Sequence, residues 1–390
     1  MLSLSILLAG LSLLIWIVLA FFRGGFWQLR AFDNDRADDA PPRWPSVAAV
    51  VPARNEAETI ARCVKALVAQ EYSGEFRIFV VDDHSEDGTA ALARDAAESV
   101  GAAGSQRVTI VQAIDLQPGW TGKLWALEQG IGVAAASAPG YFWFTDADTV
   151  HAPDTVRRLV ARAEGRKLHL ASLMVLLQAK TIPERLLIPA FLYFFLKLYP
   201  PKWIADAKSK TAGAAGGCIL LRREALERIG GIAAIRGEVI DDCALARAVK
   251  HSGGNIWMGL TRESVSFRAY STFGEIRDLI ARTAFTQLGY SALLLLGTLA
   301  GMAVTYVVPV VLAFEAQPLV WRMSLAAWAL MTVTYLPTVR FYRLSPLWAP
   351  LLPLAALFYT YATWLSAMRY WMGQGGQWKG RAQASVKAGN

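Results

Sequence analysis

The stretch that decides the fold is Tyr141-Phe142-Trp143-Phe144-Thr145-Asp146-Ala147-Asp148-Thr149, in which a run of aromatic residues ends in two carboxylates. Aromatic residues favour strands, and side chains two residues apart on an extended chain point to the same side. Asp146 and Asp148 are therefore expected to face the same way at the end of a buried strand. Neighbouring carboxylates repel each other unless a cation lies between them, and divalent metal ions take oxygen ligands. The pattern indicates a metal site; the alternative is a surface turn whose aspartates only cap the helix that starts near Pro153.

Polar clusters also follow two strands that are predicted earlier in the chain. Val47–Val51 and Arg77–Val81 are short, largely apolar runs of the kind buried on both faces of a sheet, and they lead into Arg54-Asn55-Glu56 and Asp82-Asp83. Strands alternate with helix-like segments, which predicts an α/β domain with a mostly parallel, doubly wound sheet. Because ligands of such sheets bind at the carboxyl ends of the strands, the three polar clusters are expected to share one site.

Two predicted helices carry further expectations. Asn55 and Glu58 have the spacing of a capping box, which predicts a helix that starts here and continues to about Gln70. The segment 182–200 is strongly apolar and aromatic but too short between its charges to cross a bilayer. It is expected either to lie in the membrane interface or to be a buried core helix or a lid.

Apolar residues are concentrated at the two ends of the chain, which is 54% hydrophobic and contains 14 Trp. Leu2–Phe22 is uncharged and long enough to span a bilayer, and because it lacks a cleavage site we expect a retained anchor. Further apolar stretches lie at Leu288–Phe314, Leu319–Leu336 and Leu347–Met368. The predicted organisation is an anchor (1–23), a linker (24–45), a globular domain (46–287), a membrane region of two or three helices (288–368) and a basic tail (369–390).

The charge and the cysteines narrow the classes of partner. The formal net charge is +8, but no helix or strand presents a dense basic stripe, so a surface of anionic lipid explains the charge better than nucleic acid does. Cys63, Cys218 and Cys243 are far apart and contain no Cys-x-x-Cys pair, which argues against a disulfide framework or a zinc site. The four His residues are scattered as well. The oligomeric state is not predicted.

Several motifs occur in the order and spacing of family 2 glycosyltransferases, which the chain resembles over about Ser46 to Ser291. They are Val51-Pro52-Ala53-Arg54-Asn55-Glu56, Val80-Val81-Asp82-Asp83-His84-Ser85-Glu86-Asp87-Gly88-Thr89, Gly122-Lys123, Asp146-Ala147-Asp148 and Asp241-Asp242. The resemblance implies a Rossmann-like GT-A fold with membrane helices at both ends of the chain. Further segments narrow the resemblance: Gly119-Trp120-Thr121-Gly122-Lys123, Gly217 to Arg223, Arg282-Thr283-Ala284-Phe285-Thr286-Gln287-Leu288 and the flanking apolar segments. With them the chain is similar to the hopanoid-biosynthesis-associated glycosyltransferase, a relative of ceramide glucosyltransferase.

The resemblance implies a site for a nucleotide-sugar donor, expected to be a UDP-sugar. Negative charge grows on the diphosphate as the sugar leaves, and Mg²⁺ or Mn²⁺ would neutralise it as a Lewis acid. Asp148 is the expected direct metal ligand, and Asp146 would contact the ribose or the sugar or hold metal-bound water. Other residues that the resemblance places around the donor are Pro52, Ala53, Glu56, Asp83 (toward the base) and Lys123 (toward the diphosphate).

Each of these assignments has a simpler alternative. Asp82, Asp83 and Asp87 would then serve only as turn and cap residues, and Lys123 would be a solvated loop lysine. Lys123 follows a glycine at the start of a predicted helix, and both ammonium groups and helix N-termini favour phosphate.

Asp242 is the catalytic base by resemblance, with Asp241 as its neighbour. It would take the proton from an acceptor hydroxyl that attacks the anomeric carbon, and this direct displacement would invert the anomeric centre. The alternative is that both aspartates cap the following helix. Processive relatives carry Gln-x-x-Arg-Trp, whereas this chain has Leu279-Ile280-Ala281-Arg282-Thr283. Only Arg282 matches, which argues against polymer synthesis and leaves open whether Arg282 clamps the diphosphate.

Membrane topology raises a conflict. Nucleotide sugars are cytosolic, so the globular domain is expected to face the cytoplasm of a bacterial inner membrane. Three full C-terminal spans would place the tail outside, against the positive-inside rule. Either one apolar segment is re-entrant or interfacial, or the tail breaks the rule; Trp378-Lys379-Gly380-Arg381 resembles a tail motif of related enzymes, which favours the first alternative. The basic residues concerned are Arg369, Lys379, Arg381 and Lys387.

The expected function is an inverting, metal-dependent glycosyltransferase that acts on a membrane lipid, by resemblance a hopanoid or related lipid. A polyprenyl-phosphate or sphingoid acceptor is the nearest alternative. A nucleotidyltransferase or sugar-1-phosphate transferase could use the same strand-end aspartates and metal without needing Asp242 as a base. A membrane scaffold that binds nucleotide sugar without turning it over is the non-enzymatic alternative.

Overall fold

The computed structural model describes residues 2–35, 38–374, 377–378 and 381–382, and Lys379 and Lys387 of the predicted basic tail lie outside them. The chain forms two compact units. The helical unit comprises Met1–Leu29, Gln178–Lys202 and Ala269–Gly376, and the sheet unit comprises Arg30–Leu177, Trp203–Arg268 and Gln377–Asn390. The segment 182–200 and the residues from Ala269 onward, which the sequence assigns to the globular domain, therefore group with the membrane helices.

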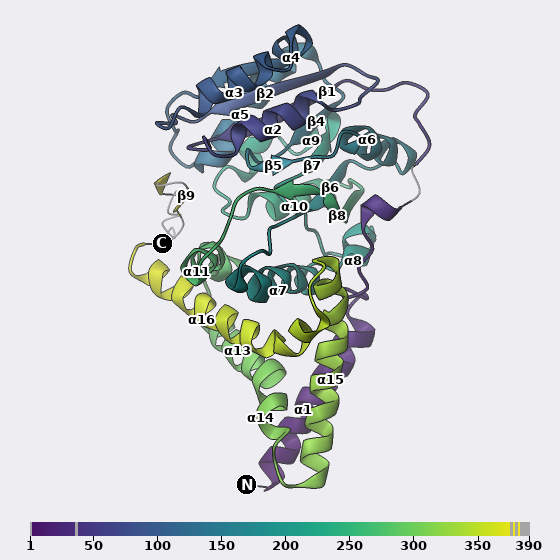
Figure 1. Cartoon of the computed structure of the whole chain (residues 1–390), viewed down its shortest axis with the longest axis vertical. Coiled ribbons are helices and arrows are strands. Elements are labelled where there is room, and N and C mark those ends of the chain that lie inside the picture. Colours follow the sequence, from purple (N-terminus) through teal and green to yellow (C-terminus); the bar gives the residue numbers. More distant parts are fainter. Residues whose placement is uncertain (1, 36–37, 375–376, 379–380, 383–390) are drawn as a thin grey trace. The chain divides into compact units, whose positions relative to one another are not determined.

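An eight-stranded sheet runs through the described part of the sheet unit, in the order β3-β2-β1-β4-β7-β6-β8-β5 (Figure 1). Its strands are β1 (Val47–Ala53), β2 (Phe76–Asp82), β3 (Val108–Gln112), β4 (Tyr141–Phe144), β5 (Thr149–Val150), β6 (Leu170–Leu176), β7 (Ile219–Arg222) and β8 (Ile256–Ser266). A separate two-stranded ladder joins β9 (Gln377–Trp378) to β10 (Arg381–Ala382). All seven residues of β1 are buried, as expected for a continuous apolar run covered on both faces.

The sheet is entirely parallel in its first half and mixed in its second half. β1, β2, β3 and β4 are parallel neighbours, whereas β7 is antiparallel to both β4 and β6. The prediction of a mostly parallel sheet is therefore wrong for the second half, where β6 and β8 are parallel and β5 is antiparallel to β8. The antiparallel register pairs Phe144, the last residue of β4, with Ile219, the first of β7. The loop that precedes β7 is thereby brought to the carboxyl end of β4.

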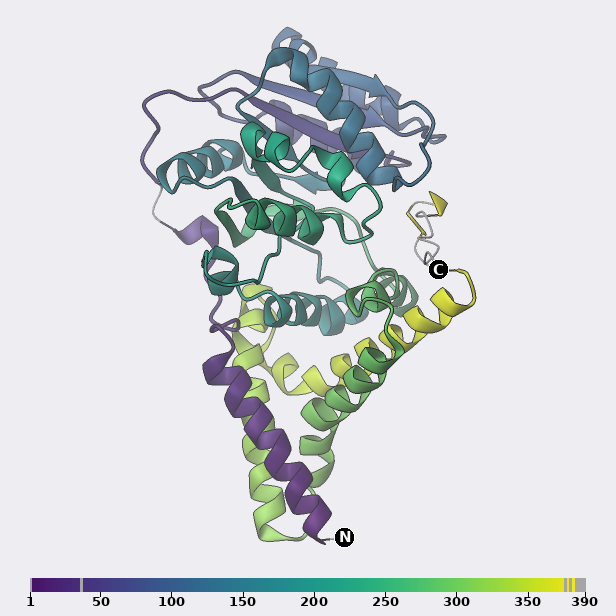
Figure 2. The same cartoon turned by 180° about the vertical axis from the view of Figure 1, so that it is seen from behind.

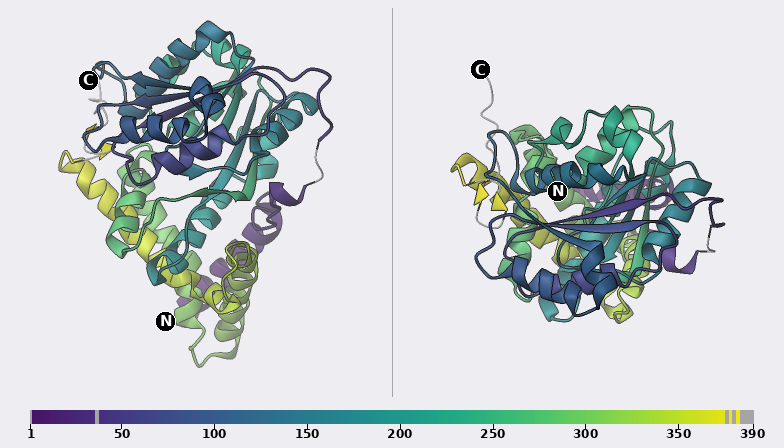
Figure 3. Two further views of the ribbon diagram at one scale, coloured as in Figure 1. Left: turned by 45° about the horizontal axis from the view of Figure 1, so that its top comes forward. Right: turned by 90° about the horizontal axis from the view of Figure 1, so that it is seen from above.

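Helices cover both faces of the sheet (Figure 3). They are α2 (Ile60–Val68), α3 (Thr89–Glu98), α4 (Ala102–Arg107), α5 (Gly122–Ala134), α6 (Thr155–Gly165), α9 (Arg223–Arg228) and α10 (Asp241–His251), with shorter turns η1 (Phe32–Asn34), η2 (Ala135–Ser137) and η3 (Ile232–Ile235). α5 packs closely on the sheet because Gly130 has no side chain: a Cβ there would lie 2.4 Å from Val50 Cγ1. The helix α8 (Pro201–Ala205) contains the point in the sequence, after Lys202, at which the chain passes from the helical unit to the sheet unit.

The helical unit contains the apolar ends of the chain. Its elements are α1 (Leu2–Phe22), α7 (Ile182–Leu198), α11 (Phe273–Ala281), α12 (Ala284–Gln287), α13 (Ala292–Met302), η4 (Ala303–Val307), α14 (Val308–Leu312), α15 (Pro318–Phe341), η5 (Pro346–Leu351) and α16 (Leu352–Trp371). Among the described residues, four helical segments are long and apolar enough to cross a membrane: Leu4–Phe22, Ala292–Leu312, Pro318–Phe341 and Pro346–Trp371.

The helix α7 is buried within the helical unit. It begins with a capping box in which Thr181 and Glu184 satisfy each other's backbone N–H groups. Tyr193 Oη lies 2.8 Å from Thr334 Oγ1 on α15, and the Leu187 carbonyl accepts a hydrogen bond of 3.0 Å from Tyr359 on α16. Of the alternatives open from the sequence, this packing matches the buried core helix.

Candidate active site

The polar clusters that follow β1, β2 and β4 lie at one edge of the sheet. Parallel pairing sets Ala53 beside Asp82, so β1 and β2 end at the same level. Phe144, the last residue of β4, lies beside Val50, so β4 ends three residues earlier at the same edge of the sheet. This is the edge at which open α/β sheets bind ligands. The structure thus brings together the residues that the sequence predicted to share a site.

The loops after β1 and β2 are tied to each other. Asn55 Oδ1 accepts a hydrogen bond from Glu86 N, and Thr89 Oγ1 accepts one from Glu56 N. Asn55 has a φ of 50°, and α2 begins only at Ile60. The capping-box prediction for Asn55 is therefore wrong, because its side chain serves the neighbouring loop instead of its own helix.

Asp83, the predicted base contact, is buried. Its side chain is 1% exposed, and Arg54 Nη1 lies 3.8 Å from Asp83 Oδ2 while donating to the Asp83 carbonyl. Ala53 holds the loop through its carbonyl, which accepts from Asp83 N, and Pro52 lines the pocket described below. Asp87 accepts from the N–H groups of Ala57 and Thr89, the turn role that was its simpler alternative.

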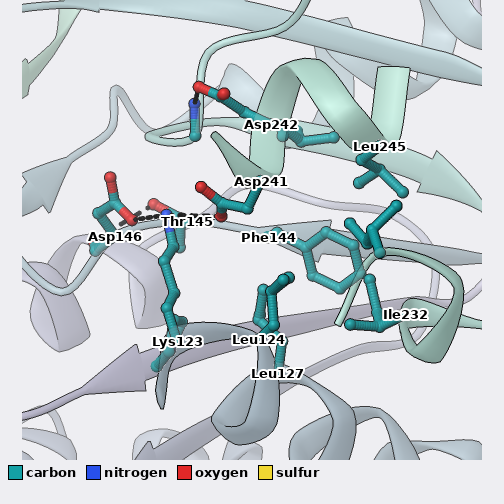
Figure 4. A pocket seen from close by; sticks show the side chains of 14 residues that line it. Lys123, Leu124, Leu127, Phe144, Thr145, Asp146, Ile232, Asp241, Asp242 and Leu245 are labelled. Carbon is teal, nitrogen blue, oxygen red and sulfur yellow. Dashed lines mark hydrogen bonds and ion pairs between the residues drawn. The ribbon is translucent and has the colours of Figure 1, made fainter. Parts of the chain in front are cut away.

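Lys123 joins the two carboxylate pairs that the sequence predicted. Its Nζ lies 2.9 Å from Asp146 Oδ1 and 3.2 Å from Asp241 Oδ2 (Figure 4). Burial alone would lower the pKa of Lys123, but the two carboxylates outweigh it and raise the pKa above its ordinary value. A solvated loop lysine is excluded by these contacts, because the ammonium group lies between two acids.

Asp242 lies beside this ion pair at the start of α10. Its Oδ2 accepts from Gly216 N at 3.0 Å and its Oδ1 from Cys243 N at 2.7 Å. Burial raises its pKa to about 6, helped by the charge of Asp241 and opposed by Lys123. A carboxylate with a pKa close to neutrality can accept a proton during a reaction and release it afterwards.

Gly216 allows this approach. A Cβ at Gly216 would lie 3.0 Å from Lys123 Nζ and 3.6 Å from Asp242 Oδ2. The loop before β7 therefore contributes its backbone and leaves room for the ion pair. The sequence showed only a small-residue loop here, without indicating that it reaches the carboxylates.

Asp148 has a different partner from Asp146. Arg268, just beyond β8, places Nε 3.4 Å from Asp148 Oδ2 and Nη2 2.7 Å from Glu56 Oε1. Burial raises the pKa of Asp148 to about 6, with Asp146 adding to the rise and Arg268 opposing it. The guanidinium group thus holds the position of a cation between two of the predicted donor-site carboxylates.

This arrangement fits a divalent ion that is completed by substrate oxygens. No group of three or more His, Cys, Asp or Glu side chains able to hold a metal occurs among the described residues. Mg²⁺ is commonly bound by one or two carboxylates together with substrate phosphates. Asp148 and Asp146 supply such carboxylates, and the presence of Arg268 beside Asp148 shows that this position favours positive charge.

A neutral hydrogen-bonded layer lies beneath the carboxylates, and the sequence did not predict it. Thr145 Oγ1 lies 2.8 Å from His151 Nε2 and donates to the Gly217 carbonyl, while His151 Nδ1 lies 2.9 Å from Ser264 Oγ. Burial lowers the pKa of His151 to about 3, so the ring is neutral at physiological pH. The position of this histidine close to the carboxylate stretch was the only signal available in the sequence.

The carboxylates border a pocket with a polar and an apolar side (Figure 4). The polar side holds Lys123, Thr145, Asp146, Asp241 and Asp242. The apolar side is formed by Leu124, Leu127, Phe144, Ile219, Ile232, Ile235 and Leu245. Arg282, the remaining predicted donor contact, follows α11 in the helical unit, so its predicted role at the diphosphate stays a prediction.

Comparisons with known proteins agree with this fold. Residues 48–230 match the family model described as Glycosyl transferase family 2. An N-acetylglucosaminyltransferase of Mesorhizobium japonicum is 32% identical over 126 residues, which cover 32% of this chain and 27% of the relative. The succinoglycan biosynthesis protein ExoO of Rhizobium meliloti is 36% identical over 121 residues, 31% of this chain and 30% of that protein. The chain thus spans less than a third of these relatives' length.

Among solved structures, a mannosyltransferase from Pyrobaculum calidifontis in complex with GDP-Man and Mn²⁺ has a similar fold. The TM-score is 0.57 at 17% identity, and the alignment covers 94% of this chain and 99% of that one. The expected GT-A fold is confirmed, and the described residues contain helices long and apolar enough to cross a membrane toward both ends of the chain. Over residues 48–230 the chain is thus similar to glycosyltransferase family 2.

Proposed function

We propose that the protein is a membrane-bound, inverting glycosyltransferase that moves a sugar from a nucleotide sugar to a lipid acceptor. The observation that carries the proposal is the convergence of Asp146 and the pair Asp241–Asp242 around Lys123. Asp146 follows the carboxyl end of β4, the edge at which sheets of this class bind ligands. Asp241 and Asp242 come from the start of α10. Sugar transfer needs two such groups, one at the donor and one at the acceptor.

In this proposal the residues divide the reaction between them. Asp148 and Asp146 would hold Mg²⁺ or Mn²⁺, which supplies Lewis-acid neutralisation of the leaving diphosphate. Lys123 stabilises negative charge on the same side of the pocket. Asp242 takes the proton from the acceptor hydroxyl. At the same time the hydroxyl oxygen attacks the anomeric carbon, and the bond between this carbon and the diphosphate breaks. Attack from the face opposite the leaving group inverts the anomeric centre.

A lipid acceptor is supported by the helical unit. Four of its segments are long and apolar enough to cross a membrane, so an acceptor can reach the protein without leaving the bilayer. A hopanoid or related lipid is the acceptor that we propose. The names of the curated relatives point instead to saccharide acceptors, and a polyprenyl-phosphate or sphingoid lipid is the further alternative.

The test is release of nucleoside diphosphate by purified protein in lipid vesicles. The donor panel contains UDP-sugars and GDP-mannose, and the acceptors are a hopanoid, a sphingoid lipid, polyprenyl phosphate and a lipid-linked saccharide. Release should require both a divalent metal and one acceptor. Asp242→Asn should reduce it by roughly 10² to 10⁴-fold, the usual contribution of a general base. Asp148→Ala should abolish the metal-dependent release.

The exposed carboxylate Glu98 provides a matched control, since Glu98→Gln changes the same kind of group far along α3 from the strand ends. Full transfer by Asp242→Asn would indicate a nucleotidyltransferase or sugar-1-phosphate transferase instead. Metal-dependent donor binding without release under any acceptor would indicate a non-catalytic scaffold. Release stimulated only by a saccharide or by polyprenyl phosphate would overturn the hopanoid assignment alone.

A further inference from the structure

The last apolar segment, Pro346–Trp371, differs from the other three candidate spans. It is broken into η5 and α16, and 44% of its most apolar stretch is buried, against 22 to 33% in the others. We infer that this segment does not cross the membrane. It enters beside α15 as η5, returns as α16 and leaves on the side from which it came, while an exposed apolar stripe of α16 contacts the acyl chains of that leaflet.

The entry runs back along α15. Trp328 Nε1 donates to the Pro350 carbonyl at 3.2 Å. Trp328 precedes Phe341, the last residue of α15, by about 20 Å of helix at ~1.5 Å per residue. The chain has therefore turned after α15 and descended to the middle of that helix by the end of η5.

After α16 the chain leaves the membrane close to the start of α13. Arg369 Nη2, in the last turn of α16, lies 2.8 Å from Asp278 Oδ1 on α11. Tyr370 stacks on Tyr290 with ring centroids 4.4 Å apart. Tyr290 immediately precedes the N-cap of α13, so α16 ends beside the point at which the next candidate span begins.

These two ends lie on one side of the membrane. α13 and α14 lead away from that side, and α15 returns to it after the turn 313–317. Figure 2 shows the N-terminus and the α14–α15 turn together at one end of the helical unit, and α16 running away from that end. The segment formed by η5 and α16 therefore enters and leaves the membrane on the side where α15 ends. The three spans are then α1, α13–α14 and α15.

The distribution of charge agrees with three spans and not with four. Arg23 follows α1, Arg340 lies in the last turn of α15 and Arg369 in that of α16. A re-entrant α16 places all three on one side, together with the basic tail. A fourth crossing would separate Arg369 and the tail from the others, against the positive-inside rule.

The exposed face of α16 is built for lipid. Five side chains spaced 3, 4, 3 and 7 residues apart form one helical stripe with exposed fractions of 44 to 53%: Leu354, Leu357, Tyr361, Trp364 and Trp371. The opposite face is buried and includes Ala355, Ala356, Tyr359 and Ala362. The chain carries no charge from Leu344 to Met368. The candidate spans α13 and α15 also expose large apolar side chains, among them Leu293, Leu296 and Val333, so the bilayer is the partner of matching chemistry.

Labelling with a membrane-impermeant maleimide tests the side of the tail. Cys63, Cys218 and Cys243 are buried, so they give a low background in the folded protein. Gln374→Cys reports the end of α16, Glu98→Cys the sheet unit and Phe314→Cys the α14–α15 turn. Gln374→Cys should react from the same side as Glu98→Cys and from the opposite side to Phe314→Cys. Reaction of Gln374→Cys from the side of Phe314→Cys would overturn the inference.

Spin labels along the stripe give an independent test of the path. Nitroxides at 354, 357, 361, 364 and 371 should be accessible to oxygen, and their immersion depth should decrease steadily from Leu354→Cys to Trp371→Cys. A spanning helix would give the greatest depth near residue 361 and shallow labels at both ends, which would contradict the inference. Neither measurement requires transfer activity, so failure here and failure of the proposed function are distinguishable.

Discussion

Asp146 and Asp148 are two residues apart, yet they belong to two different electrostatic groups. Asp146 shares Lys123 with Asp241, the neighbour of the proposed base, whereas Asp148 shares Arg268 with Glu56. Each pair of acids shares one basic side chain, which offsets one of the two negative charges. The difference indicates that Lys123 is part of the pocket itself, whereas Arg268 lies where a metal ion would compete with it for Asp148.

Of the substitutions that test these two groups of charges, removal of Lys123 should have the largest effect on stability and on transfer. Lys123→Met leaves Asp146 and Asp241 without their common partner, and loss of one member of a partly buried ion pair costs about 3 kcal/mol or more. We expect a lower melting temperature and a transfer rate reduced by roughly 10²-fold, since an electrostatic stabiliser of the leaving group is lost. Thermal unfolding and kcat/KM measure the two effects.

The matched control is Lys65→Met, which removes the same charge from an exposed position on α2. Equal effects of the two substitutions would mean that Lys123 matters only through net charge. The distinction drawn between the Lys123 group and the Arg268 group of acids would then be wrong.

The pH dependence of transfer separates the two acids with raised pKa values. Burial raises the pKa of Asp242 to about 6, and a base works only when it is deprotonated. Activity should therefore be constant above pH 7 and fall about tenfold per pH unit below 6. Because bound metal keeps Asp148 deprotonated, kcat/KM measured at saturating Mn²⁺ isolates Asp242. A fall that begins only near pH 4 would contradict the assignment of Asp242 as the base.

Arg268 should have the smallest effect, and it acts on binding instead of transfer. Arg268→Gln removes the cation that competes for Asp148, so the affinity for Mn²⁺ without donor should rise by about fivefold, or ~1 kcal/mol. Titration of free Mn²⁺ by its EPR signal measures this directly. Arg247→Gln, at an exposed position of α10, is the control. Unchanged or weaker Mn²⁺ binding in Arg268→Gln would show that the guanidinium group does not occupy the metal position.

The sequence was sufficient for residues whose role depends on local structure. Asp146 and Asp148 follow an apolar strand, so the strand pattern placed them at the sheet edge. Lys123 lies at a helix start, and the family resemblance placed it at the diphosphate. The Asn55 cap was wrong because a tertiary partner, Glu86 N, competed successfully with the local helix.

Arg268 and Gly216 could not be predicted, because their positions depend on long-range pairing. β5 pairs with β8 through Thr149 and Ser266, and this register brings Arg268 to Asp148. Gly216 reaches Asp242 because β7 runs antiparallel to β4, which no local pattern indicated. Both residues carry ordinary loop signals in the sequence.

The buried Thr145–His151–Ser264 layer has a consequence for how such chains vary. Each side chain satisfies another across three separate segments, so a single substitution leaves a buried polar group unsatisfied, which costs ~1 to 3 kcal/mol. Replacement of all three by apolar groups of similar shape would avoid that penalty. Among related chains, these three positions should therefore change together, and a chain that retains only one of them should be rare.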